Sequence, residues 1–109
     1  MMQFNRWDVW FASVRFEDSA EVKSRPVVIT DHGEVYVLAL KVTSHAPRDV
    51  WGEYELVYWR EAGLSKPSTV RISKRLRLEP HDMIRKVGTL HPADIMSIIT
   101  IMRERQRNI

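Results

Sequence analysis

The chain has 109 residues, of which 44% are hydrophobic, and it carries a formal net charge of +3. This size predicts one domain, spanning residues 1–109, whose functional site is a surface groove rather than a large internal cavity. The absence of cysteine excludes disulfides, a thiolate nucleophile and cysteine-bound zinc or iron–sulfur centres.

The first half of the chain reads as three β-strands. Residues 7–16, "WDVWFASVRF", mix aromatic and β-branched residues and predict a strand buried on much of both faces. The polar stretch 17–24 predicts a loop. A short strand at 26–30 is closed by the turn signal "DHG" at 31–33, and the strongest strand pattern follows at 34–42. Together, 26–42 predict a β-hairpin.

The second half predicts further short strands and one helix. A strand is expected at 53–59, and the segments 69–73 and 75–79 alternate basic with apolar residues, which predicts strands with one face on the core. A short strand or turn is expected at 83–90. Residues 91–106 have a proline suited to the first helical turn and an apolar stripe at helical spacing, and they predict a C-terminal helix.

These elements predict a mainly β fold with a C-terminal α-helix. Strands this short in a small chain are expected to curl into a barrel-like sheet, because curling limits the exposed edges. The apolar stripe of the helix is explained most simply by packing on that sheet, and a dimer face is the alternative.

Charge and hydropathy narrow the classes of partner and location. The sequence pI of about 9.5 favours a polyanionic partner, although a domain that is merely basic fits equally well. No apolar run reaches the roughly 18 residues that a membrane span needs. The first ten residues lack the apolar segment of a signal peptide. We therefore expect a cytoplasmic protein that does not bind membranes.

The entrance of the strand at 26–30 carries a candidate anion site. Pro26 restricts Arg25 to an extended backbone, so the arginine projects from a fixed position. Hairpin pairing of 26–30 with 34–42 sets Arg25 opposite about position 42, which brings Arg25 and Thr43 to the same open end. An arginine beside the hydroxyls of Thr43 and Ser44 can bind phosphate. A surface cluster without a ligand is the alternative, which this spacing alone leaves ahead.

Motifs for metals and cofactors are absent from the sequence. The four histidines are scattered without metal-ligand spacing, and the four glycines are isolated rather than arranged in a phosphate loop. We therefore predict no metal site and no cofactor.

Four segments, in order and spanning nearly the whole chain, resemble the MazF/PemK-like toxin family of type II toxin–antitoxin systems. They are "WDVWFASV" (7–14), "KSRPVVIT" (23–30), "LALKVTSH" (38–45) and a C-terminal block from "STVRIS" to the helix (68–102). The family implies a homodimer of SH3-like barrels that cleaves single-stranded RNA without a metal and is neutralised by an acidic antitoxin. Attack by the RNA 2′-hydroxyl on the adjacent phosphate would leave a cyclic phosphate and a 5′-hydroxyl end.

The resemblance also implies roles for individual residues. Arg25 matches the arginine before proline and Thr43 the strand-end threonine, so both are expected to be catalytic, with Arg25 stabilising the phosphorane. Apart from the resemblance, the expected substrate-binding residues are Lys23, Ser44, His45, Lys74, Arg75 and Arg77, because the basic ones fall in segments expected to border one groove. A solvated strand face is the alternative for the basic residues, and a structural or merely exposed side chain is the alternative for His45. Lys41 and Arg71 fall in segments expected to border the same groove.

Departures from the family pattern keep alternatives open. The loop 17–24 is short and lacks glycine, and Ser73-Lys74 stands where many members have Asp-Gln. The alternatives are a non-nuclease toxin of the same fold that binds DNA gyrase, and an inactive member that only binds RNA.

Overall fold

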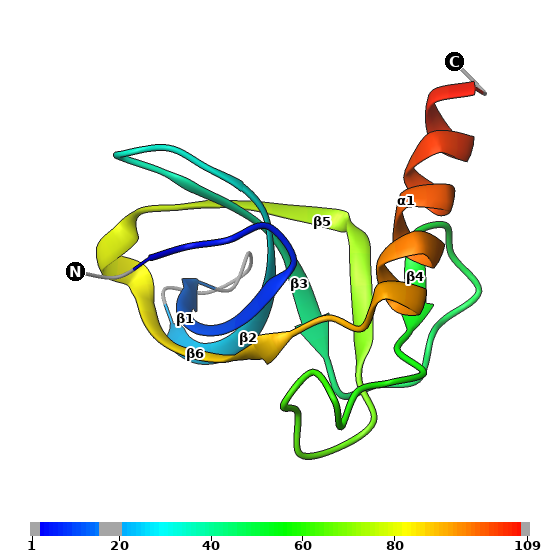
Figure 1. The fold of residues 1–109 in the computed structure, drawn as a ribbon, viewed down its shortest axis with the longest axis horizontal. Coiled ribbons are helices and arrows are strands. Elements are labelled where there is room, and N and C mark those ends of the chain that lie inside the picture. Colours follow the sequence, from blue (N-terminus) through cyan, green and yellow to red (C-terminus); the bar gives the residue numbers. More distant parts are fainter. Residues whose placement is uncertain (1–2, 16–20, 108–109) are drawn as a thin grey trace.

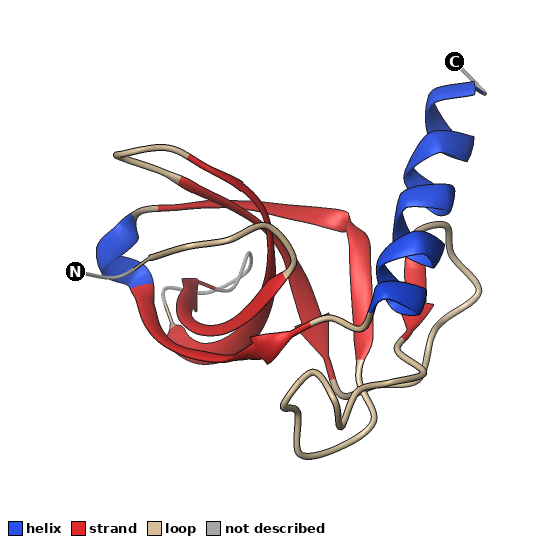
Figure 2. Ribbon diagram, viewed as in Figure 1, coloured by secondary structure: helices blue, strands red, loops and turns tan. Residues whose placement is uncertain are grey.

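The computed structural model describes residues 3–15 and 21–107, which form one sheet and one long helix (Figure 1, Figure 2). The strands are β1 (Asp8–Arg15), β2 (Val22–His32), β3 (Val37–Thr43), β4 (Glu53–Glu55), β5 (Thr69–Leu78) and β6 (Met83–Thr89). A 3-10 turn, η1 (Pro80–Asp82), precedes β6, and the helix α1 (Pro92–Arg107) ends the described chain.

All six strands belong to one antiparallel sheet in the order β4-β5-β3-β2-β1-β6. The sheet curls so strongly that β1, β2 and β6 wrap around one another (Figure 1). Within the described residues the hydrogen-bonded ladder does not close, because β4 and β6 remain its two edges. The predicted fold class, mainly β with a C-terminal helix, is confirmed.

Several predicted boundaries were wrong. β2 begins at Val22, inside the stretch 17–24 predicted as a loop; residues 17–20 of that stretch, and the last residue of the strand predicted at 7–16, lie outside the described part of the chain. β5 is one continuous strand rather than two. β4 covers only Glu53–Glu55 instead of 53–59, because the backbone N–H groups of Val57 and Tyr58 donate to the carboxylate of Asp94 and not to a neighbouring strand.

The predicted hairpin of β2 and β3 is present. Val27 pairs with Lys41 and Ile29 with Ala39, and the register shifts by one residue closer to the turn. Continuing this register from Val27 sets Arg25 opposite Thr43, as the sequence predicted to within one residue. The open end of the hairpin therefore presents both side chains at the same edge of the fold.

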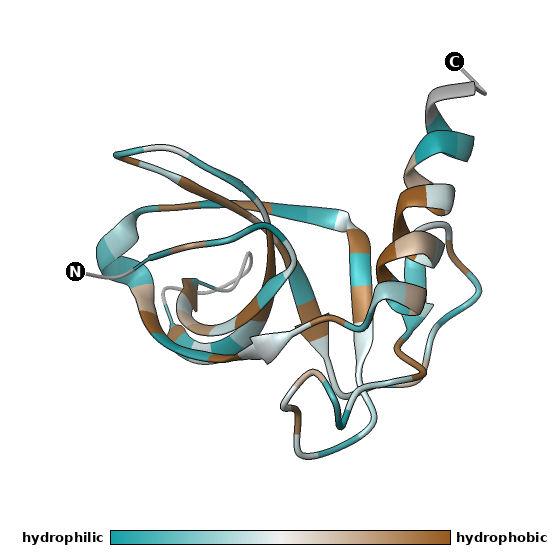
Figure 3. Cartoon of the chain, in the orientation of Figure 1, coloured by the Kyte–Doolittle hydropathy of each residue, from teal (hydrophilic) through white to brown (hydrophobic). Residues whose placement is uncertain are grey.

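Hydrophobic and hydrophilic residues alternate along parts of the strands (Figure 3), and buried apolar residues form two clusters. One apolar cluster contains Trp10, Val27 and Ile29, and a second cluster contains Val28 and Ile98. Neighbouring residues of β2 thus belong to different clusters, as the period of two in a strand requires.

The helix α1 confirms the helix predicted at 91–106 within a residue at each end. Its Ile98 is fully buried, and Ile95, Ile101 and Met102 pack against the same cluster. The apolar stripe therefore faces the sheet. Among the described residues, none of the helical segments is both long and apolar enough to span a bilayer.

Candidate active site

A cavity of about 590 Å³ opens at the end of the β2–β3 hairpin where the strands diverge. We call it the basic pocket. Its wall is formed by Phe11, Ser24, Arg25, Pro26, Lys41, Val42, Thr43, Ser44, His45, Gly63, Leu64, Ser65, Lys66, Ser68, Arg71, Arg85 and Val87. The strands β1, β2, β3, β5 and β6 all contribute to it, together with the loop between β4 and β5.

The described wall of the basic pocket carries positive charge only. Five of its side chains are lysine or arginine, namely Arg25, Lys41, Lys66, Arg71 and Arg85, and none of the lining residues is aspartate or glutamate. Clustered like charges in a concave surface raise the local potential and attract ions of the opposite sign. This arrangement suits a polyanion better than a neutral substrate.

Arg25 reaches the pocket from the middle of a paired strand. It pairs with Ala12 of β1 and is half-buried, and the following Pro26 also lines the pocket. Pairing with β1 and the restriction by proline fix where the side chain begins. The guanidinium is planar and can donate two parallel hydrogen bonds to a phosphate.

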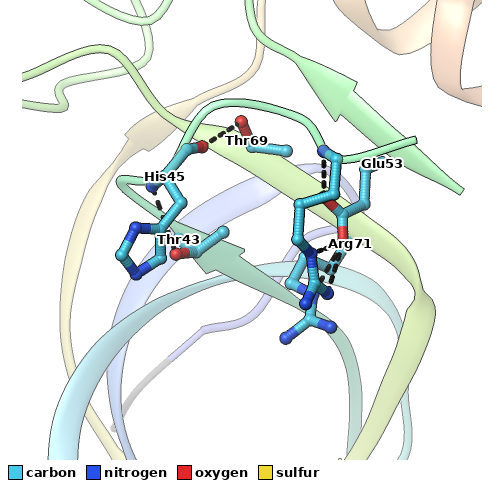
Figure 4. A network of polar contacts seen from close by, with 6 residues as sticks. Thr43, His45, Glu53, Thr69 and Arg71 are labelled. Carbon is cyan, nitrogen blue, oxygen red and sulfur yellow. Dashed lines mark hydrogen bonds and ion pairs between the residues drawn. The ribbon is translucent and has the colours of Figure 1, made fainter. Parts of the chain in front are cut away.

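Hydrogen bonds order the segment that follows β3 (Figure 4). The hydroxyl oxygen of Thr43 accepts a bond of 3.3 Å from the backbone N–H of His45, and the buried Thr69 donates its hydroxyl to the His45 carbonyl at 2.6 Å. Because the Thr43 oxygen is an acceptor in this contact, its O–H proton is the group that it can offer to a phosphate oxygen.

A carboxylate lies behind the pocket wall (Figure 4). The side chain of Glu53 is 2% exposed and forms ion pairs with Arg48 at 2.7 Å and with Arg71 at 3.4 Å. The hydrogen bonds from Arg48, aided by the charge of Arg71, lower the pKa of Glu53 to about 2. Glu53 is therefore an anion at neutral pH, and it forms an ion pair with Arg71, a residue of the pocket wall.

The structure brings together some of the predicted site residues and separates others. Arg25, Thr43, Ser44 and His45 all line the basic pocket. The remaining four predicted residues, Lys23, Lys74, Arg75 and Arg77, do not line it.

The excluded residues have other surroundings. Arg77 stacks over the ring of Tyr36, 4.8 Å from its centroid, near the closed end of the hairpin. Arg75 pairs with Leu40, and Lys23 lies near Glu21 with 3.9 Å between the charged groups. The alternation along β5 correctly predicted that Arg75 and Arg77 are exposed. They lie outside the pocket because β5 is long and continues beyond it.

Two cations of the pocket were not identified from the sequence. Arg85 lies on β6 with its guanidinium 4.6 Å from the centre of the Phe11 ring, and Lys66 belongs to the loop between β4 and β5. The pairing of β1 with β6 contains two register shifts. Simple alternation along β6 therefore could not predict that Arg85 lines the pocket.

Clusters of metal-ligating side chains were also sought. In the described ranges, 3–15 and 21–107, no group of three or more histidine, aspartate or glutamate residues could hold a metal ion.

No protein-family model matches the sequence, and no curated protein matches it. Solved structures do match. The Mycobacterium tuberculosis toxin MazF-mt6 superposes with a TM-score of 0.66 at 20% identity, over 86% of this chain and 90% of its own. An endoribonuclease from a mycobacterial species, solved in complex with its cognate antitoxin, superposes with a TM-score of 0.66 at 17% identity, over 88% and 87%. The chain therefore has the fold of these toxins, as its four sequence segments led us to expect.

Proposed function

We propose that this protein is an endoribonuclease toxin that cleaves single-stranded RNA at the basic pocket. The observation that carries the proposal is the grouping of five lysine and arginine side chains with Thr43 and Ser44 in one cavity without a carboxylate on its described wall. Phosphodiester backbones are the cellular polyanions that such a set recognises. The two similar structures, one a toxin and one an endoribonuclease with its antitoxin, support the same reading.

The reaction needs no nucleophile from the protein. The 2′-oxygen of the RNA forms a bond to the adjacent phosphorus as its proton departs, and the bond from phosphorus to the 5′-oxygen breaks. The solvent takes up the 2′-proton and returns a proton to the leaving oxygen, which gives a 2′,3′-cyclic phosphate and a 5′-hydroxyl end. Preorganised donors that meet the charge of the phosphorane lower the barrier of such a step.

Arg25 and Thr43 supply these donors in our proposal. Arg25 binds two non-bridging oxygens of the phosphorane, and Thr43 donates its hydroxyl to one of them, with Ser44 assisting. A guanidinium keeps its proton at neutral pH, so Arg25 acts as a stabiliser of charge rather than as a general acid. His45, which follows the hydroxyl pair, would contact the substrate from the rim of the pocket.

The proposed partners follow from the same charge pattern. A partly disordered, acidic antitoxin could fold onto the basic pocket and block it, because its carboxylates would replace the RNA phosphates. We also propose that the toxin is a homodimer and acts in the cytoplasm. Sedimentation of the purified protein would test whether it is a homodimer.

The experiment is cleavage of a mixed-sequence single-stranded RNA in the presence of EDTA. We expect cleavage by the wild-type protein to persist, which would show that no metal ion is needed. Arg25→Ala should lower the rate about 100- to 1,000-fold, the range seen when one transition-state donor is removed.

Arg103→Ala is the matched control, since Arg103 is an exposed residue of α1 outside the pocket and its loss should leave the rate unchanged. RNA that stays intact at every sequence tested would refute the proposal. Binding without cleavage would instead identify a member that only binds RNA.

A further inference from the structure

Three charged residues lie in a row across neighbouring strands beside the basic pocket. Lys41 of β3 is directly opposite Arg71 of β5, and Arg71 is directly opposite Glu53 of β4. Like charges placed opposite each other in a sheet are unfavourable. Glu53 lies on the other side of Arg71 and forms an ion pair with it at 3.4 Å.

Glu53 divides its charge between two arginines that differ in position. Arg48 is 60% exposed and lies outside the pocket, whereas Arg71 is 18% exposed and lines it. Arg48 makes the stronger contact, with hydrogen bonds from its side chain and from its backbone N–H. Arg71, a residue of the pocket wall, thus shares its anion with an arginine outside the pocket.

We propose that Arg71 is a second phosphate-binding arginine of this site and that Glu53 is the residue that positions it. Arg71 binds the phosphate next to the one held by Arg25, so the pocket grips two successive phosphates of one strand. This inference rests on the proposed function and names how its substrate is held.

The sheet geometry separates the two arginines. Arg25 lies on β2 and Arg71 on β5, with β3 between them, which places their strands about 10 Å apart. Two anchors at this spacing suit neighbouring phosphates better than one shared phosphate. Lys41, on the strand between them, contributes charge to both.

The test measures binding of a 2′-O-methyl oligoribonucleotide, which cannot undergo 2′-attack, at several salt concentrations. Arg71→Gln should weaken binding about 10-fold and reduce the slope of log affinity against log salt by about 0.7, the value for one contact to a single-stranded phosphate. Arg48→Gln is the matched control, because it also removes an ion pair of Glu53 but no charge of the pocket wall. It should keep the wild-type slope.

Glu53→Gln tests whether Glu53 acts by positioning Arg71 or only through its effect on the net charge of the site. Removing an anion beside the pocket would tighten RNA binding if only net charge mattered. If Glu53 holds Arg71 in place, we expect about 3-fold weaker binding with an unchanged slope. Thermal unfolding of each variant identifies any loss of folded protein.

The possible outcomes are distinct. Equal slopes for Arg71→Gln and Arg48→Gln would overturn the role of Arg71, and Glu53→Gln binding as tightly as wild type or tighter would overturn the role of Glu53. A wild-type protein that neither binds the oligonucleotide nor cleaves RNA would instead refute the proposed function.

Discussion

At the scale of single residues, Glu53 shows how a side chain outside the pocket can control one within it. Its side chain is 2% exposed, and two arginines compensate for its charge. Removing one partner of such a group is costly, because the remaining charge is left with less compensation in a site shielded from water. The carboxylate therefore couples stability of the fold to the shape of the pocket wall.

The lowered pKa of Glu53 predicts a pH-dependent contribution to stability. The value is about 2 in the folded protein against an ordinary 4.5, so the folded state binds the proton less readily than the unfolded state. The stabilisation is thus complete above about pH 4.5 and is lost as the pH falls toward 2. Urea unfolding should show that wild type and Glu53→Gln differ in their free energy of unfolding, and that this difference becomes smaller as the pH falls from about 4.5 toward 2. A difference that stays constant from pH 6 to pH 2.5 would contradict it.

Sequence reasoning placed Arg25 and Thr43 at the same open end of the hairpin because this position follows from local rules. Proline fixes the backbone before it, and a hairpin sets the register of its own two strands. Glu53 and Arg85 could not be found in this way. Glu53 meets Arg71 only through the pairing of β4 with β5, and Arg85 reaches the pocket through a ladder with two register shifts. Neither arrangement is encoded by a pattern within one segment.

At the scale of elements, Asp94 joins the start of α1 to the end of β4. It is 1% exposed and accepts hydrogen bonds from the Tyr54 hydroxyl at 2.6 Å and from the backbone N–H groups of Val57 and Tyr58. Burial, followed by the hydrogen bond to Asp94, raises the pKa of Tyr54. An acid in the first turn of a helix is favourable, but no pattern in the sequence indicates that Asp94 bonds to the end of a strand 36–40 residues earlier.

Asp94→Ala should destabilise the protein by about 3 kcal/mol, because it leaves a buried hydroxyl and two backbone N–H groups without their charged acceptor. Met96→Ala is the control. Met96 lies in the same helix and is 58% exposed, so its replacement should change stability by less than about 0.5 kcal/mol. Urea unfolding measures both, and equal effects of the two substitutions would show that Asp94 is not a clamp.

At the scale of the whole molecule, the loop between β4 and β5 contacts β6, the strand at the opposite edge of the curled sheet. Its Ala62 and Gly63 lie against the backbone of Val87 and Gly88 on β6, the opposite edge strand. Gly63 has a φ of +88°, a conformation that residues with a side chain rarely adopt. The same loop supplies Leu64 and Lys66 to the pocket, so the segment that contacts β6 also forms part of the pocket wall.

Gly88→Ala tests this contact between the loop and β6. An added Cβ would collide with the carbonyl oxygen of Ala62, which is backbone and cannot turn aside, so the loop must move away from β6. We expect a loss of about 2 kcal/mol in stability, typical of overpacking, together with slower RNA cleavage, because the loop forms part of the pocket wall. Gly33→Ala is the control, since its Cβ would meet the ring of Tyr36, a side chain that can shift. Wild-type cleavage by Gly88→Ala, in a protein destabilised as expected, would show that the pocket forms without the closed loop.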